Sequence, residues 1–210
     1  QARRLKFANE LLPDLESLSP LINRTGSDSS SMDNMLELLV TGGMDLFRGL
    51  RMIIPPAWQN VETMDPDLRA FYEFNSMHME PWDGPAGVVL TDGRHAVCLL
   101  DRNGLRPARW MLTADRHFLV ASEAGVWEVP TERVVRKGKL GPGEMIAIDL
   151  KRGDLLDSEA VDRINRGRAP YKQWLQQGVT YLQTELIDPS LVEEPFDERT
   201  LRSYHKLFQL

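Results

Sequence analysis

The residue types best able to carry chemistry are an aspartate among hydroxyls and a group of arginines in one short segment. Asp28 lies between Ser27 and the serines of residues 29–31, where a helical pattern begins. Its carboxylate could cap the helix, and because a carboxylate has about four acceptor sites it could also hold a substrate ammonium group. Capping is the commoner use of an aspartate at this position, so the residues alone favour that role.

The segment at residues 101–109, DRNGLRPAR, brings together Arg102, Arg106 and Arg109. The planar donor fork of arginine binds phosphate and carboxylate well, so one interpretation of the segment is an anion site. The other interpretation is a turn and a strand whose arginines are solvated or paired, the default state of this side chain. Without further context the second interpretation is favoured.

The other reactive residue types do not form a complete active site. Cys98 lies in an apolar run, where a thiol behaves as a small buried hydrophobe rather than a nucleophile. The four histidines show no metal-ligand spacing, and the chain has no second cysteine. The serines lack the Gly-x-Ser-x-Gly elbow of a hydrolase, and the glycines form no phosphate loop. We therefore expect no catalytic residue, metal site or cofactor site within the chain.

Helices with regular apolar spacing are expected around Asp28. Residues 32–40 carry apolar side chains on one helix face, and the two glycines at 42 and 43 are a C-terminal stop. A second helical segment covers residues 44–53, and a third begins at Pro66 with Asp65 as its cap. Residues 151–178 are expected to be mostly helical, with a short helix over 171–177, and further helices are expected over residues 3–18 and 197–210.

The arginine segment follows a predicted β-hairpin. Residues 87–91 and 96–100 are apolar at consecutive positions, which predicts a sheet covered on both faces. The dipeptide Asp92-Gly93 between them predicts a tight type I′ turn. A second turn at Asn103-Gly104, with strands over 110–113 and 117–122, would complete a four-stranded meander. Short strands are also predicted over 126–129, 134–135 and 145–148, with a turn at 140–144.

Length and composition exclude several classes of protein. A chain of 210 residues with 42% hydrophobic and 27% charged residues can bury a large core and is unlike a disordered chain. The net charge of −6 argues against a nucleic-acid partner. No apolar run reaches the length of a membrane span, and a single cysteine fits a reducing compartment. A cytoplasmic location is expected.

Seven motifs, taken in order, resemble the N-terminal class II glutamine amidotransferase (glutaminase) domain of glutamate synthase large subunits. They are GSDSSSMDN at 26–34, MIIPPAW at 52–58, YEF at 72–74, EPWDGPA at 80–86, DRNGLRPAR at 101–109, ASEAG at 121–125 and GKLGPGE at 138–144. The resemblance implies that residues 1–180 are the C-terminal part of this domain. Residues 181–210 would then be a linker and the start of the next, central domain.

The resemblance implies a fold and an activity. The fold would be α+β, part of a four-layer αββα sandwich of antiparallel sheets, the N-terminal-nucleophile (Ntn) hydrolase fold. The activity would be hydrolysis of L-glutamine to glutamate and ammonia, with the ammonia channelled to 2-oxoglutarate for glutamate synthesis. The family uses an N-terminal cysteine as nucleophile and an Asn-Gly pair as oxyanion hole. Gln1, Cys98 and Asn103-Gly104 do not match these groups, so the chain alone is expected to be inactive.

The resemblance also implies site residues, cofactors and partners. Asp28 matches the aspartate that binds the α-amino group of glutamine, which makes substrate binding its expected role, whereas Arg106 and Arg109 are expected to be structural. FMN and an iron-sulfur cluster are implied for the full-length enzyme and no cofactor for this chain. The implied partners are L-glutamine, the rest of the large subunit and a reductase small subunit. The electron donor (NADPH, NADH or ferredoxin) does not follow from the sequence.

Two alternatives remain open at the level of the sequence. One is another class II amidotransferase, such as the phosphoribosyl amidotransferase of purine synthesis, which shares a related Arg-Pro motif. It would need a phosphate-binding loop further along the chain. The other alternative is a non-catalytic scaffold that keeps the fold without the nucleophile.

Overall fold

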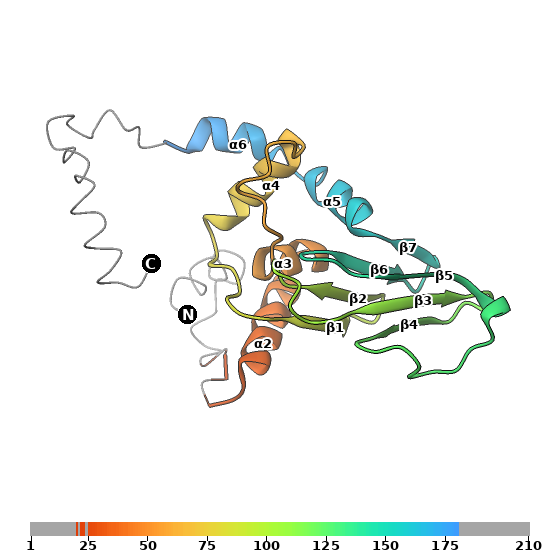
Figure 1. Ribbon diagram of the computed structural model, residues 1–210. Coiled ribbons are helices and arrows are strands. Elements are labelled where there is room, and N and C mark those ends of the chain that lie inside the picture. Colours follow the sequence, from red (N-terminus) through yellow and green to blue (C-terminus); the bar gives the residue numbers. More distant parts are fainter. Residues whose placement is uncertain (1–19, 21, 24, 181–210) are drawn as a thin grey trace, which may run out of the picture. The chain divides into compact units, whose positions relative to one another are not determined.

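The computed structural model describes residues 20, 22, 23 and 25–180, and Figure 1 shows the order of its elements. The helices are α2 (Asp28–Thr41), α3 (Leu46–Ile53), α4 (Pro66–Ser76), α5 (Ser158–Arg166) and α6 (Tyr171–Gly178), with a 3₁₀ turn, η2, at Thr131–Arg133. The strands are β1 (Gly87–Thr91), β2 (His95–Leu100), β3 (Arg109–Thr113), β4 (Phe118–Ala121), β5 (Val134–Lys139), β6 (Met145–Asp149) and β7 (Asp154–Leu156). The helices expected over 3–18 and 197–210 lie outside the described residues.

Local capping signals placed the helices correctly. The Asp45 carboxylate accepts the backbone N–H groups of Phe47 (3.0 Å) and Arg48 (3.3 Å) at the start of α3. Asp65 caps α4 in the same way, with Pro66 in the first turn, as its position predicts. Helix α2 ends at Thr41 with Gly42 as its C-cap, and the following Gly43 has a positive φ of 91°. The predicted helices α2, α3, α4 and α6 are thus confirmed.

The strands form two antiparallel sheets. Sheet A has the order β1-β2-β6-β7 and sheet B the order β4-β3-β5. The α+β class with two antiparallel sheets is therefore confirmed. The predicted four-stranded meander is wrong, because β1 and β2 belong to sheet A whereas β3 and β4 belong to sheet B. Residues 101–108 cross from one sheet to the other; this crossover is too long for a tight turn and contains Pro107, which cannot donate to a strand ladder.

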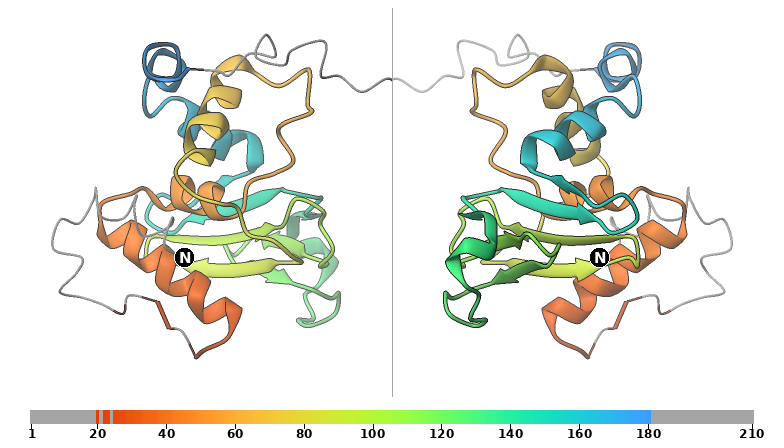
Figure 2. Two further views of the ribbon diagram at one scale, coloured as in Figure 1. Left: turned by 90° about the vertical axis from the view of Figure 1, so that its left-hand side faces the viewer. Right: turned by 90° about the vertical axis from the view of Figure 1, so that its right-hand side faces the viewer.

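The central strands β2 and β6 of sheet A are covered on both faces, as the consecutive apolar residues of 96–100 predict. For the edge strand β1 the prediction is wrong, because Val89 there is 68% exposed. On one face, Val97 and Leu99 of β2 join the core formed with α2 and α3. On the other face, Cys98 and Leu100 pack against Trp110 and other side chains of sheet B. Figure 2 shows α2 on one side of the strands and the β3–β4 region on the other. The two central strands therefore lie between helices and a second sheet.

The hairpin between β1 and β2 turns one residue later than predicted. Thr91 pairs with Ala96, so the tip consists of Gly93 and the residue after it rather than Asp92 and Gly93. Gly93 has a φ of 84°, but Arg94 has no positive φ, which excludes a type I′ turn. The Asp92 side chain instead accepts the Arg94 N–H at 2.9 Å. The Asp92 carboxylate thus stabilises this turn through a hydrogen bond, whereas the Asp-Gly pattern predicted the turn from backbone angles alone.

Four further elements differ from the expected ones. The strand predicted at residues 126–129 is wrong, and Val126 there is 57% exposed. Strand β7 was not predicted, and α5 was covered only by a general expectation of helix over residues 151–178. The short strand of residues 134–135 extends to Lys139 as β5. Among residues 20, 22, 23 and 25–180, no helix is long and apolar enough to cross a membrane.

Candidate functional site

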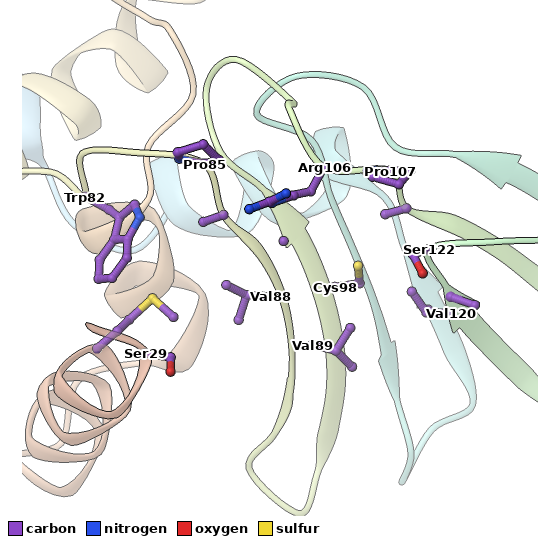
Figure 3. A pocket seen from close by; sticks show the side chains of 15 residues that line it. Ser29, Trp82, Pro85, Val88, Val89, Cys98, Arg106, Pro107, Val120 and Ser122 are labelled. Atoms are coloured by element: carbon purple, nitrogen blue, oxygen red, sulfur yellow. The ribbon is translucent and has the colours of Figure 1, made fainter. Parts of the chain in front are cut away.

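A cavity of about 420 Å³ opens between the first turn of α2, the start of β1, the crossover and the end of β4. Figure 3 shows Ser29 on one side of it, Val120 and Ser122 on the other, and Arg106 between them. Most of its lining is apolar, and the polar lining groups come from Ser29, Trp82, Cys98, Arg106 and Ser122. A cavity of this size with a few convergent polar groups is typical of a small-molecule site.

The N-terminus of α2 places Asp28 beside this cavity rather than in its wall. The cap of the helix is Ser27, whose hydroxyl accepts the Ser30 N–H at 3.3 Å. Asp28 is the first helical residue and is exposed, and its neighbour Ser29 lines the cavity. The interpretation of Asp28 as a helix cap is therefore wrong, because Ser27 fills that position. The carboxylate remains available to bind a ligand, and its role toward a substrate stays a prediction.

The three arginines of the DRNGLRPAR segment do not converge on one anion. Arg102 lies 4.0 Å from Asp83, and both side chains are exposed. Arg106 lines the cavity. Arg109 instead lines a separate hollow of about 390 Å³ on the outer face of sheet B. The strand and the crossover direct these side chains to different faces, so a joint anion site is excluded.

Two donors at the cavity lack partners within the described part of the chain. Arg106 has no hydrogen bond or ion pair there, and the buried Trp82 Nε1 has no acceptor. The backbone N–H of Trp82 donates to Ile53 O at 2.6 Å, which anchors the residue to the end of α3. Buried donors normally have partners, so the unpaired Trp82 Nε1 suits a group that carries acceptor oxygens, and the exposed Arg106 adds a cationic donor at the cavity.

Cys98 lies on the floor of the cavity but is poorly suited to attack a substrate. Its side chain is only 2% exposed, and burial raises the pKa of the thiol to about 11. The residue is therefore a thiol rather than a thiolate at neutral pH, whereas nucleophilic attack needs the thiolate. Cys98 acts here as part of the packed interior between the two sheets.

The crossover depends on the buried carboxylate of Asp101, which was not among the residues predicted to have a role. Asp101 is 4% exposed, and its carboxylate accepts the N–H groups of Ala86 (3.0 Å) and Asn103 (2.9 Å). Burial alone would raise the pKa of Asp101, but these backbone donors outweigh it and hold the pKa below its ordinary value. The turn at Asn103-Gly104 is confirmed, with a φ of 60° at Gly104. The sequence signal that indicates this role is an aspartate placed two residues before an Asn-Gly pair, where its side chain can accept a backbone N–H of the turn.

No metal centre is formed in the part of the chain that the structure covers. Within that part no group of three or more His, Cys, Asp or Glu side chains is placed to hold a metal ion. Cys98, the one cysteine of the sequence, is free and buried. The candidate site is thus the cavity between α2 and the two sheets, together with Asp28 at its edge.

Comparison with known proteins links this architecture to one family. Residues 1–174 match the family model described as "Glutamine amidotransferases class-II". The NADPH-type glutamate synthase large chain of Bacillus subtilis (strain 168) is 40% identical over 204 residues, which are 96% of this chain and 13% of that protein. The NADH-type glutamate synthase of Schizosaccharomyces pombe is 40% identical over 188 residues, 89% of this chain and 9% of that protein.

A ferredoxin-dependent glutamate synthase, from Antithamnion sp., is 38% identical over 193 residues, 91% of this chain and 12% of that protein. This chain therefore spans 9% to 13% of the length of these three relatives. Relatives named for three different electron donors match it almost equally well. The similarity of this region thus does not depend on the electron donor.

Proposed function

The chain belongs to the class II glutamine amidotransferase family, and we propose that it is part of the glutaminase domain of a glutamate synthase. Its task would be to help hydrolyse L-glutamine to glutamate and ammonia, with the ammonia passed to 2-oxoglutarate elsewhere in the enzyme. The observation that carries this proposal is the 40% identity to a glutamate synthase large chain over 96% of the sequence. Because the named relatives are glutamate synthases, the purine-synthesis amidotransferase is not favoured.

In this proposal Asp28 binds the α-ammonium group of glutamine. Its exposed carboxylate lies at the first turn of α2, one residue before Ser29 in the cavity wall. An ionised carboxylate forms charge-assisted hydrogen bonds with an ammonium group, and these are stronger than neutral ones. The cavity would hold the rest of the amino acid, whose oxygens meet unpaired donors there.

The chemical step would use groups from other parts of the full-length enzyme. Attack on an amide needs an activated nucleophile, a base and donors aimed at the developing oxyanion. Cys98 is buried and protonated, and Asn103-Gly104 has a structural role in the crossover. The 210-residue chain alone is therefore proposed to be inactive. Glutamine hydrolysis by the isolated chain that disappears in a Cys98→Ser variant would contradict this.

The finer description of the fold is also a proposal. A four-layer αββα sandwich of the Ntn-hydrolase type would require a helical layer over the outer face of sheet B. Met111 and Leu119 on that face line a hollow of about 390 Å³, which leaves apolar surface for such a layer to cover. We propose residues 1–180 as the C-terminal part of the domain and 181–210 as a linker with the start of the central domain. The family match to residue 174 and the compact unit to Gln177 support the first range.

The remaining features of the full-length enzyme follow from its proposed class. FMN and an iron-sulfur cluster would bind outside this chain and supply the reduction that forms glutamate. A reductase small subunit would be a partner of enzymes that draw electrons from a nicotinamide cofactor. A single buried cysteine fits a reducing compartment, so the cytoplasm is proposed as the location.

Replacing Asp28 by Asn in the full-length enzyme tests the proposed function. Loss of the charge-assisted bonds to the substrate ammonium group should raise the KM for glutamine about tenfold or more. Steady-state glutamate formation at varied glutamine concentrations measures this effect. The matched control is Asp33→Asn, because Asp33 is an exposed aspartate on the same helix that does not line the cavity. An unchanged KM for glutamine in Asp28→Asn would contradict the proposed role of Asp28 in binding the α-ammonium group.

A further inference from the structure

Asp101 ties together three segments of the chain through its main chain and side chain. Its N–H donates to Ala86 O at 2.9 Å, and its carbonyl accepts the N–H groups of Gly104 (2.9 Å) and Gly143 (2.8 Å). Its carboxylate adds the bonds to Ala86 and Asn103. One residue therefore holds the segment before β1, the start of the crossover and the turn before β6.

The segments joined by Asp101 are packed too closely to move independently. A Cβ atom on Gly104 would lie 2.8 Å from Pro142 Cα, and one on Gly87 would lie 3.1 Å from Arg106 Cβ. The backbone at the start of β1 therefore packs directly on the side chain of Arg106. The space between Gly87 and Arg106 does not admit even a Cβ atom without a shift, so displacement of one of these groups displaces the other, although both are exposed at the surface.

We propose that Asp101 is a positioning residue for glutamine binding, which holds Ala86 and Arg106 at the separation that the cavity requires. Ala86, Gly87 and Arg106 line the cavity, whereas Asp101 does not. Asp101 therefore acts on the substrate only through these neighbours and affects binding rather than the chemical step. The inference rests on the proposed function, because it takes the cavity as the place where glutamine binds.

The test uses the full-length glutamate synthase that contains this chain, with Asp101→Asn and Asp101→Glu variants. Glutamate formation is measured at varied glutamine concentrations and, separately, with ammonium chloride in place of glutamine. Loss of one charged hydrogen bond to the backbone should raise the KM for glutamine about tenfold in Asp101→Asn and leave kcat within about twofold. Asp101→Glu keeps the charge and should raise the KM less. The ammonia-dependent rate should not change, because free ammonia does not need the cavity.

Asp92→Asn is the matched control. Asp92 also accepts two backbone N–H groups, those of Arg94 (2.9 Å) and His95 (2.6 Å). It lies at the tip of the β1–β2 hairpin, whereas Asp101 follows the opposite end of β2, and it does not line the cavity. The same chemical change there should leave the KM for glutamine unaltered.

A rise in KM confined to the Asp101 variants, with the ammonia-dependent rate intact, supports the proposal. An unchanged KM, or an equal rise in Asp92→Asn, overturns it. Loss of the ammonia-dependent rate together with the glutamine-dependent rate also overturns it, because Asp101 would then maintain the fold in general. A wild-type enzyme that uses ammonia but not glutamine overturns the proposed function itself.

Discussion

At the scale of single residues, short acidic side chains hold the turns of this protein by accepting backbone N–H groups. Asp45 and Asp65 do so at helix N-termini, and Asp101 does so in the crossover. An ionised carboxylate forms stronger hydrogen bonds than a neutral acceptor and can satisfy several donors at once. Aspartates in this chain therefore often have a structural role, whereas Asp28, the aspartate considered for substrate binding, is not the cap of its helix.

Asp149 at the end of β6 should make stability depend on pH. The Arg94 side chain donates to it at 2.9 Å, and the N–H groups of Lys151 (2.9 Å) and Arg152 (3.0 Å) also donate. The Arg94 hydrogen bond, with the help of these backbone donors, lowers the pKa of Asp149 to about 2. Since an unfolded aspartate has a pKa of about 3.9, this stabilisation is complete above that value and is lost as the pH falls through about 2.

The pH effect is checked by urea denaturation of the chain at several acidic pH values. An Asp149→Asn variant should lose stability at neutral pH and show a weaker decline of its free energy of unfolding between about pH 4 and pH 2. Asp154→Asn is the control, because Asp154 is half-exposed and its ion pair with Arg152 lies at the surface. Equal pH profiles for wild type and Asp149→Asn would contradict the assignment.

At the scale of elements, the crossover between the two sheets depends on close backbone approach. Gly104 has a φ of 60°, and a Cβ there would lie 2.8 Å from Pro142 Cα. Gly93 at the hairpin tip has a φ of 84°, and a Cβ atom placed on it would have no other atom within 4 Å. Both glycines avoid the strain of a positive φ, but only Gly104 also avoids a steric clash.

Replacing each glycine by alanine separates the two effects. Gly93→Ala should cost about 1 kcal/mol of folding free energy, the strain of a positive φ alone. Gly104→Ala should cost about 3 kcal/mol, because a backbone clash adds to that strain. The midpoints of chemical denaturation give both values. Equal losses of folding free energy in Gly93→Ala and Gly104→Ala would contradict this, because the turn before β6 would then move away from the new methyl group without cost.

At the scale of the whole molecule, a buried cation joins the helices to the turn before β6. Arg51 of α3 is 1% exposed, and its Nη1 donates to Gly143 O at 2.7 Å. Its Nε lies 3.4 Å from Asp162 of α5 in an ion pair without an aligned hydrogen bond. The hydroxyl of Tyr72 of α4 donates to the same carboxylate at 3.0 Å. Three helices and the turn that bonds to Asp101 therefore share one polar network.

Arg51→Met should destabilise the fold by about 3 kcal/mol, because it leaves the Asp162 carboxylate without its cation in a largely buried place. Burial already raises the pKa of Asp162, and Arg51 opposes that rise. A double variant, Arg51→Met with Asp162→Leu, should regain part of the loss. The control is Arg163→Met, whose exposed pair with Glu159 should be worth less than about 1 kcal/mol. Urea denaturation measures all four proteins, and equal losses for both single variants would contradict the network.

Local signals in the sequence were sufficient for helices α2, α3, α4 and α6 and for the family. Caps such as Asp65 before Pro66 and the apolar spacing of residues 32–40 act within one or two turns of chain, so they determine a helix wherever it packs. The consecutive apolar residues of β2 likewise required cover on both faces. Motifs such as DRNGLRPAR pointed to the amidotransferase family without any knowledge of the site that they help to build.

Only the tertiary structure decided which strands share a sheet and where the arginines point. Pairing of β3 with β4 and β5 rather than with β2 depends on contacts between residues far apart in the sequence, and no local pattern contains them. The same crossover turns Arg106 into the cavity and Arg109 to the outer face of sheet B. The sequence alone therefore identified Asp28 and the arginines as candidates. Their separation, and the place of Asp101 between three segments, arise from long-range packing.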